Sequence, residues 1–149
     1  MRGQLIIYTI GFTKKSAEEF FRILSKTRAR HLIDIRLNNT SQLAGFTKRD
    51  DLRYFLRELL NMEYHEIPEL APEKTFLNDY RKTQDWTNYE RSYLVLLKRR
   101  QAEKIISPKL FEEGIVLLCS EPKPDRCHRR LAAEYLAKLK PAETRIVHL

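Results

Sequence analysis

Two cysteines, one glutamate, one histidine and three arginines lie between residues 119 and 130. Cys119 ends a run of five apolar residues, a pattern typical of a strand that is buried on both faces. From Leu131 onward, apolar residues recur at the spacing of an amphipathic helix. In an open parallel sheet, ligands bind where a strand ends and a loop leads into a helix N-terminus. We therefore predict that the functional site lies in this segment.

Two carboxylates are the candidates for acid and base chemistry. Glu121 follows the apolar run by two residues, so its carboxylate is expected to reach into the crevice. Asp34 ends a second apolar segment and shares one face of it with Arg36. A carboxylate beside arginines stays ionised and is suited to act as a base, a nucleophile or a metal anchor. A structural interpretation stays open, in which Asp34 and Arg36 pair with Arg129 and Glu121 to lock the end of the sheet.

The two cysteines suggest different chemistry. Cys127 precedes a predicted helix and lies beside Arg126, His128 and Arg129, all of which stabilise a thiolate, although a packed helix-start cysteine fits equally. Cys119 is expected to be a small buried hydrophobe. A phosphatase-like nucleophile would need an arginine six residues on, whereas Arg126 is seven residues away. Zinc on these thiols and His128 would need another histidine, and adjacent Cys and His side chains rarely face one metal, so we assign no metal site.

The composition narrows the class of protein. The 149 residues include 42% hydrophobic and 32% charged residues, as expected for one globular domain, and the formal net charge is +8. This charge favours nucleic acid or another polyanion as a partner, although a solvated basic surface explains it as well. The lack of a long apolar run, a signal peptide and a disulfide framework predicts a cytoplasmic protein that does not bind membranes.

Several familiar sites are excluded by their motifs. The sequence contains neither GxGxxG nor GxxxxGK[ST], so no nicotinamide or flavin cofactor and no phosphate-binding loop are expected. The motifs HExxH, CxxC and GxSxG are also absent. The sequence does not identify any other cofactor and leaves the oligomeric state open.

Hydrophobic periodicity predicts a single three-layer α/β domain over residues 1–149. We expect about five mostly parallel strands alternating with four helices on both faces, a Rossmann-like topology without a dinucleotide fingerprint. The first strand, helix and second strand should form a βαβ unit whose two strands pair with each other. The strands are predicted at 4–10, 31–36, 62–67, 115–119 and 144–149, and the helices at 16–24, 47–60, 86–100 and from 128 onward. Residues 68–87 are expected to form a lid or to contain a short helix.

Aromatic residues near basic ones suggest base stacking. Phe12 and Phe46 are the preferred candidates because both lie in loops that should surround the crevice, whereas Tyr80 and Trp86 are expected to belong to the core.

The chain contains the motifs YTIG (8–11), LIDIR (32–36), IPEL (67–70), LCSE (118–121) and CHR (127–129). Through these five motifs and Tyr64, the whole chain resembles the domain of unknown function 488 family. The sequence departs from the family where Ala71 and Pro72 replace glycines and where no proline follows Arg36. The resemblance implies a small α/β domain with these motifs at one edge of the sheet, and it implies no activity.

We expect a nucleic-acid-processing enzyme, most plausibly a hydrolase of a phosphodiester or N-glycosidic bond. The alternatives are a nucleic-acid-binding module without catalysis and a thiol enzyme that uses Cys127. The candidate catalytic residues are Asp34, Glu121, Cys127 and His128. The candidate residues for binding nucleic acid or phosphate are Gly11, Phe12, Arg36, Phe46, Arg126, Arg129 and Arg130.

Overall fold

The computed structural model describes residues 5–40, 44–121, 124–140 and 143–149. Within these ranges the chain forms one sheet of five strands, all parallel, in the order β3-β2-β4-β1-β5. The strands are β1 (Leu5–Gly11), β2 (His31–Asp34), β3 (Glu63–Glu66), β4 (Ile115–Cys119) and β5 (Thr144–His148). The predicted strands are therefore confirmed, and Gln4 lies outside the described residues.

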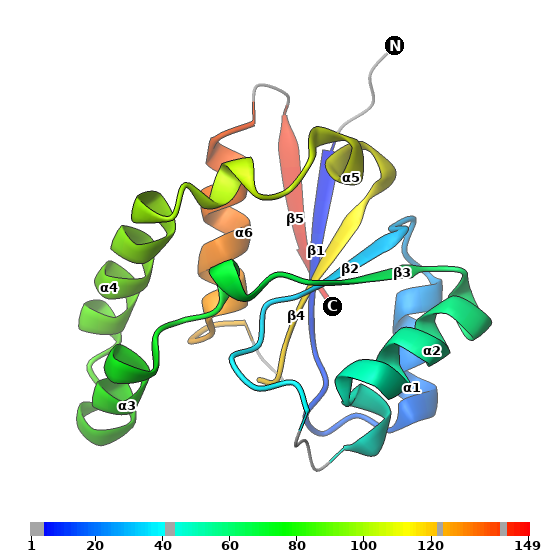
Figure 1. Cartoon of the computed structure of the whole chain (residues 1–149), viewed down its shortest axis with the longest axis horizontal. Helices are drawn as coiled ribbons and strands as arrows, with labels where there is room; N and C mark the ends of the chain where they lie inside the picture. Colours follow the sequence, from blue (N-terminus) through cyan, green and yellow to red (C-terminus); the bar gives the residue numbers. More distant parts are fainter. Residues whose placement is uncertain (1–4, 41–43, 122–123, 141–142) are drawn as a thin grey trace.

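Six α-helices surround this sheet in the described part of the chain. They are α1 (Ala17–Ser25), α2 (Arg49–Leu60), α3 (Lys74–Thr83), α4 (Trp86–Arg99), α5 (Pro108–Glu113) and α6 (His128–Lys138). Two buried clusters, one on each face of the sheet, make up the core. Residues of α1 and α2 pack in one cluster, whereas residues of α4, α5 and α6 pack in the other (Figure 1). The predicted three-layer α/β domain is confirmed.

The strand with the most apolar sequence occupies the centre of the sheet. All five residues of β4 are buried, and β4 pairs with β2 on one side and with β1 on the other. The prediction that the first two strands pair with each other was therefore wrong. β1 and β2 run parallel to each other, but β4 lies between them. A strand without polar side chains suits the centre of the sheet, because both of its faces can be buried there without leaving a polar side chain unpaired.

The local signals at helix ends agree with the structure. Ser16 caps α1 by accepting a hydrogen bond from the backbone N–H of Glu19, 3.1 Å away. Helix α2 ends at Leu60 and is capped by Asn61, which adopts a left-handed backbone conformation.

Two of the six helices, α3 and α5, were not predicted from the sequence. Helix α3 lies beside α4 (Figure 1), and its apolar residues Phe76, Leu77 and Tyr80 are only half-buried, which weakens the periodic pattern. Tyr93 of α4 donates a 2.6 Å hydrogen bond to the carbonyl of Leu70 and so anchors the segment before α3. Helix α5 has only six residues, too few to show a helical repeat.

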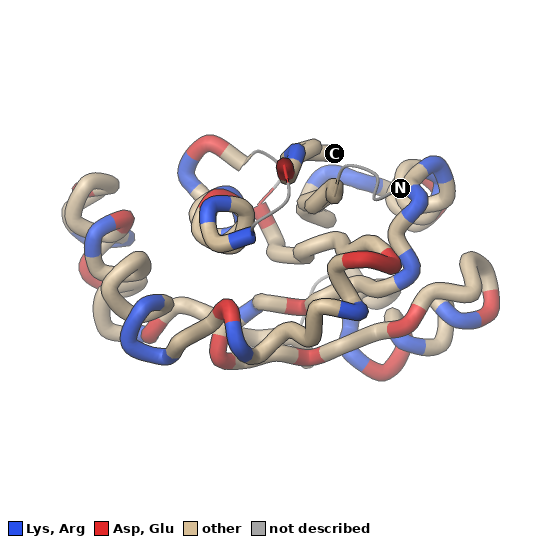
Figure 2. The backbone as a smooth tube through the Cα atoms, turned by 90° about the horizontal axis from the view of Figure 1, so that it is seen from above, with Lys and Arg blue, Asp and Glu red and all other residues tan. Residues whose placement is uncertain are grey.

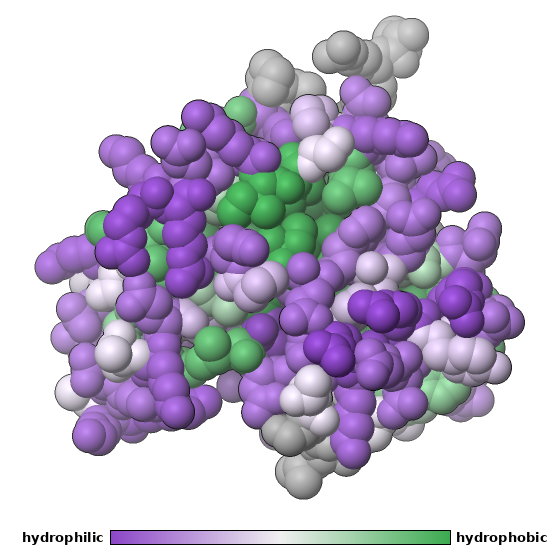
Figure 3. Space-filling model, in the orientation of Figure 1, coloured by the Kyte–Doolittle hydropathy of each residue, from purple (hydrophilic) through white to green (hydrophobic). Residues whose placement is uncertain are grey.

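The basic residues are spread over most elements, as Figure 2 shows, and acidic residues lie among them. None of the described helices combines the length and the apolar character that crossing a membrane requires. On the face seen in Figure 3 the surface is mainly hydrophilic, with an apolar area between α4 and α5.

Candidate functional site

The C-terminal ends of β1, β2 and β4 meet at one edge of the sheet. Gly11 pairs with Cys119, and the backbone N–H of Ile35 donates to the carbonyl of Leu118. A Cβ on Gly11 would lie 1.6 Å from the backbone oxygen of Glu121. Only glycine therefore allows β1 to approach the loop after β4 this closely.

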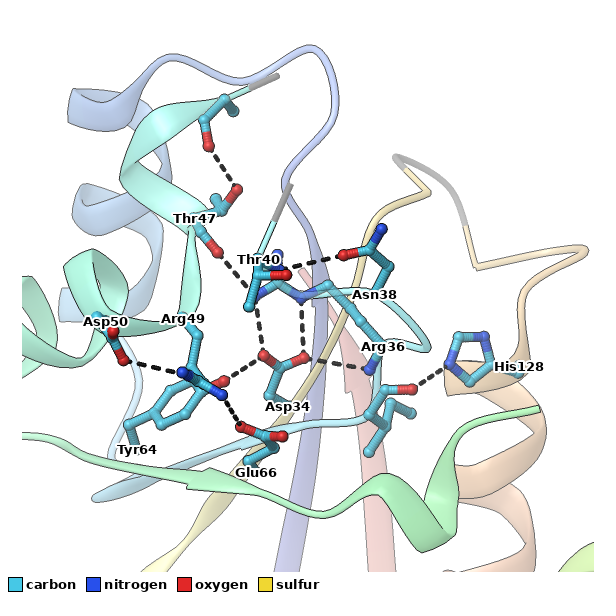
Figure 4. Close-up of polar contacts among 12 residues, drawn as sticks. Asp34, Arg36, Asn38, Thr40, Thr47, Arg49, Asp50, Tyr64, Glu66 and His128 are labelled. Carbon is cyan, nitrogen blue, oxygen red and sulfur yellow. Dashed lines mark hydrogen bonds and ion pairs between the residues drawn. The ribbon is translucent and has the colours of Figure 1, made fainter. Parts of the chain in front are cut away.

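Asp34 and Arg36 form a buried, bidentate ion pair (Figure 4). Arg36 Nε lies 2.9 Å from Asp34 Oδ1, and Arg36 Nη2 lies 2.8 Å from Asp34 Oδ2. The Tyr64 hydroxyl also donates to Asp34, while Arg36 donates to the carbonyl of Thr47. Burial, together with the Asp34 charge, raises the pKa of Tyr64. These partners occupy both oxygens of Asp34, so its carboxylate is suited to positioning Arg36 rather than to acting on a substrate.

The side chain of Arg129 is wholly buried behind the loop that follows β4. Its Nη1 donates to Cys119 Sγ at 3.1 Å and to the backbone carbonyl of Glu121, and its Nε lies 3.3 Å from Thr9 Oγ1. The contact between Arg129 and Glu121 thus involves the backbone of Glu121. The structural interpretation expected Asp34 and Arg36 to pair with Arg129 and Glu121, whereas Asp34 and Arg36 pair with each other. This arrangement leaves the carboxylate of Glu121 exposed.

The guanidinium of Arg129 makes Cys119, rather than Cys127, the better candidate for a thiolate. Burial opposes ionisation of Cys119, but hydrogen bonds from Cys127 and Arg129 and the Arg129 charge outweigh it, so its pKa is lowered. Burial and the neighbouring Cys119 raise the pKa of Cys127 well above its usual value. The Cys127 thiol therefore acts as a hydrogen-bond donor to Cys119.

His128 is held as a neutral imidazole. Its Nε2 donates to the carbonyl of Ile35 at 2.7 Å (Figure 4), so its Nδ1 carries the lone pair and lies 4.0 Å from Cys127 Sγ. Burial, and secondarily the charge of Arg129, lowers the pKa of His128 to about 4. At neutral pH, His128 is therefore uncharged, and its low pKa makes it a poor base for the Cys127 thiol.

A cavity of about 550 Å³ opens between this edge of the sheet and the α3–α4 pair. In Figure 3 the outline of the molecule is indented between α3 and the rest of the protein. The volume lies within the range of pockets that enclose small ligands. The cavity walls combine one carboxylate, four basic side chains, three aromatic rings and the site's imidazole and thiols: Glu121; Arg36, Lys74, Arg81 and Arg126; Tyr80, Trp86 and Tyr89; His128, Cys119 and Cys127.

The aromatic wall comes from α3 and the start of α4. The Trp86 ring stacks on Tyr89, with ring centres 5.0 Å apart and planes 18° apart, and Tyr80 meets Trp86 nearly edge-on. Arg130 lies 5.8 Å from the Trp86 ring centre and stabilises it as a cation–π partner. A rigid aromatic surface beside basic groups is suited to bind a planar, negatively charged ligand.

The structure brings only part of the predicted site to the cavity. Five predicted residues lie on its wall, namely Arg36, Glu121, Arg126, Cys127 and His128. Gly11 and Arg129 are not on the cavity wall but contact the backbone of Glu121, which is. Asp34 pairs with Arg36 and holds its side chain in place. Arg130 contacts the wall through Trp86.

The two preferred stacking residues belong to the core instead. Phe12 is 6% exposed and lies beneath Arg36, whose guanidinium carbon is 5.6 Å from the ring centre. Phe46 packs against Phe20 and Phe21. Basic and aromatic residues between 74 and 89 line the cavity in their place, although the sequence analysis expected Tyr80 and Trp86 to belong to the core. Their mixture of aromatic and basic residues in an irregular segment was the available signal.

The fold and this edge define a three-layer α/β protein with a cavity at the C-terminal ends of its strands. The family model for the domain of unknown function DUF488 matches residues 16–136, and the chain belongs to that family. No curated protein and no solved structure gives a significant match.

Proposed function

We propose that this protein is a nucleic-acid-processing enzyme that hydrolyses a phosphodiester or N-glycosidic bond in the cavity at the C-terminal edge of the sheet. The observation that carries this proposal is the composition of the cavity wall. It joins an exposed carboxylate, Glu121, to four basic side chains and three aromatic rings within about 550 Å³. This is the set of groups that one nucleotide unit requires, with rings for the base and cations for the phosphate.

Each part of the wall has its own role in this proposal. Arg126 and Arg81 contact phosphate oxygens, and a base that has been taken out of its helix packs against the aromatic wall of Tyr80, Trp86 and Tyr89. Arg36 is preorganised by Asp34, and its Nη1 has no hydrogen-bond partner among the described residues. Glu121 either removes a proton from the attacking water or stabilises positive charge that develops on the sugar.

The experiment is a denaturing gel of end-labelled DNA and RNA oligonucleotides, with normal and modified bases. The protein is tested with and without magnesium and with a final alkali step. We expect direct cleavage, or abasic sites that alkali reveals, with the wild type and at least 100-fold less product with Glu121→Gln, since loss of a positioned acid or base costs about 10²–10⁴ in rate.

Asp125→Asn is the matched control, because Asp125 is an exposed carboxylate in the same loop and is not among the described residues of the cavity wall. Full activity of Glu121→Gln would contradict the proposal. Intact strands that still shift on a native gel would instead support a binding module without catalysis.

A thiol-dependent enzyme is a second candidate, and the contact between Arg129 and Cys119 favours it. The sequence suggested Cys127 as the reactive thiol, whereas the geometry favours Cys119 as the thiolate. We expect thiolate absorbance of the folded protein to titrate below the usual thiol range. Cys119→Ser should remove this titration, and Cys127→Ser, which keeps a donor, should retain it. The opposite pattern would contradict the assignment.

A further inference from the structure

A second cluster of ligating side chains lies at the opposite, N-terminal edge of the sheet. His31 and Glu63 are the first residues of β2 and β3 and are paired in register, and His65 lies two residues along β3 on the same face as Glu63. His31 Nδ1 lies 2.9 Å from His65 Nε2 and 3.4 Å from Glu63 Oε2. The third side of this triangle, from His65 Nε2 to Glu63 Oε2, is 3.7 Å.

These three distances match one face of a tetrahedral metal site. Zinc binds histidine nitrogen and carboxylate oxygen at about 2.0–2.2 Å, which places tetrahedral ligands about 3.3–3.6 Å apart. The observed 2.9–3.7 Å lies around that value. Two imidazoles and one carboxylate with one open position form a known zinc ligand set.

The orientation of His31 also fits a metal ligand. Its Nε2 lies 2.9 Å from Glu113 Oε1 at the end of α5, so Nε2 carries the proton and donates it to that carboxylate. The Nδ1 lone pair therefore points toward His65 and Glu63. A carboxylate that fixes the tautomer of a ligating histidine in this way is typical of metal sites.

We propose that His31, Glu63 and His65 bind one divalent ion of the zinc class, with Glu113 positioning His31. The side chain of His31 is 5% exposed and that of Glu63 is 72% exposed, so the ion would enter from the surface. A neighbouring hollow of about 260 Å³, lined in part by Arg30 and Asn61, leaves room for a fourth ligand such as water or a small anion. The site is separate from the cavity of the proposed function.

Metal binding at this site would link the edge strand β3 to its neighbour β2. β3 pairs with β2 alone in the described sheet, and the ligands come from both strands. An ion that binds only the folded chain raises the free energy of unfolding by RT ln(1 + [metal]/Kd). When no metal is bound, a hydrogen bond can take its place, since His65 Nε2–H can donate directly to His31 Nδ1.

Zinc titration of the full chain, followed by calorimetry and by competition with a chromophoric chelator, tests the proposal. We expect one ion per chain and a Kd at least about 100-fold weaker in His65→Gln and in Glu63→Gln. Glu113→Gln should weaken binding by about 10–100-fold, the range for residues that orient a ligand. His65 and Glu63 are not fully buried, so these two variants are expected to fold.

The matched controls are His148→Gln and Glu66→Gln, which change the same residue types outside the cluster and should leave the Kd unchanged. Cobalt bound in place of zinc should show the visible spectrum of a tetrahedral nitrogen and oxygen site, without a thiolate charge-transfer band. Absence of zinc binding, unchanged binding in His65→Gln, or loss of binding in Cys119→Ser would each overturn the proposal.

Discussion

At the scale of single residues, the protonation of His128 makes the stability of the folded protein depend on pH. Its pKa is about 4 in the folded protein, against 6.5 for an ordinary histidine. Between these values the unfolded chain binds a proton that the folded chain does not, so stability falls as the pH drops from 6.5 toward 4 and does not depend on His128 above that range. The full effect is up to about 3 kcal/mol.

We predict that urea unfolding in the presence of EDTA shows this loss in the wild type. His128→Gln should reduce the slope by up to about 1.4 kcal/mol per pH unit, which corresponds to one proton. Other histidines titrate in both proteins, so the difference between the two curves reports on His128. Parallel curves would show that His128 is not held neutral.

The ion pair between Asp34 and Arg36 leads to a second prediction at this scale. Asp34→Asn would leave a buried guanidinium without its charge partner, so we expect a loss of about 3 kcal/mol in the free energy of unfolding. Glu66→Gln is the control, because Glu66 forms an exposed pair with Arg49 at 3.6 Å and should cost less than about 1 kcal/mol. Equal effects of the two changes in urea unfolding would contradict the structural role of Asp34.

At the scale of elements, the close approach of β1 to the loop after β4 depends on Gly11. Gly11→Ala would press a methyl group into the carbonyl of Glu121, so we expect a loss of more than about 2 kcal/mol and a displaced Glu121. Gly45→Ala should change stability by less than about 1 kcal/mol, because a Cβ there meets nothing within 4 Å. Thermal unfolding of both variants measures the difference, and a stable, fully active Gly11→Ala protein would contradict it.

The sequence predicts the strands and helices better than it predicts which of them lie side by side. The five strands and the edge that carries Arg36, Glu121, Cys127 and His128 follow from apolar runs and from the rule for parallel sheets. The central place of β4 in the sheet does not follow from these signals, since a linear pattern carries no information on strand order. The aromatic wall comes from a segment some 30 to 40 residues upstream of Glu121, where the half-buried helix α3 has a weak apolar repeat. The pairing of His31 with Glu63 depends on the register of β2 and β3, which only the structure supplies.

At the scale of the whole molecule, the charge of +8 is spread over the surface, so it is the cavity that should determine specific binding. If single-stranded nucleic acid binds there, log Kd should change with log salt by about 0.7 for each phosphate contact. Arg126→Gln should reduce this slope by about 0.7, whereas Arg22→Gln, on an exposed face of α1, should not change it. Equal slopes for both variants in fluorescence anisotropy would place binding on the general surface.

The most direct test of the cavity uses Trp86, the only tryptophan in the chain and part of the aromatic wall. Its intrinsic fluorescence is measured while a single-stranded oligonucleotide is added, and binding is followed in parallel by the anisotropy of a labelled strand. A base that stacks in the cavity should quench Trp86 in proportion to the bound fraction, with the same Kd by both signals. Binding with unchanged Trp86 fluorescence, or no binding by either signal, would contradict the assignment of this cavity to nucleic acid.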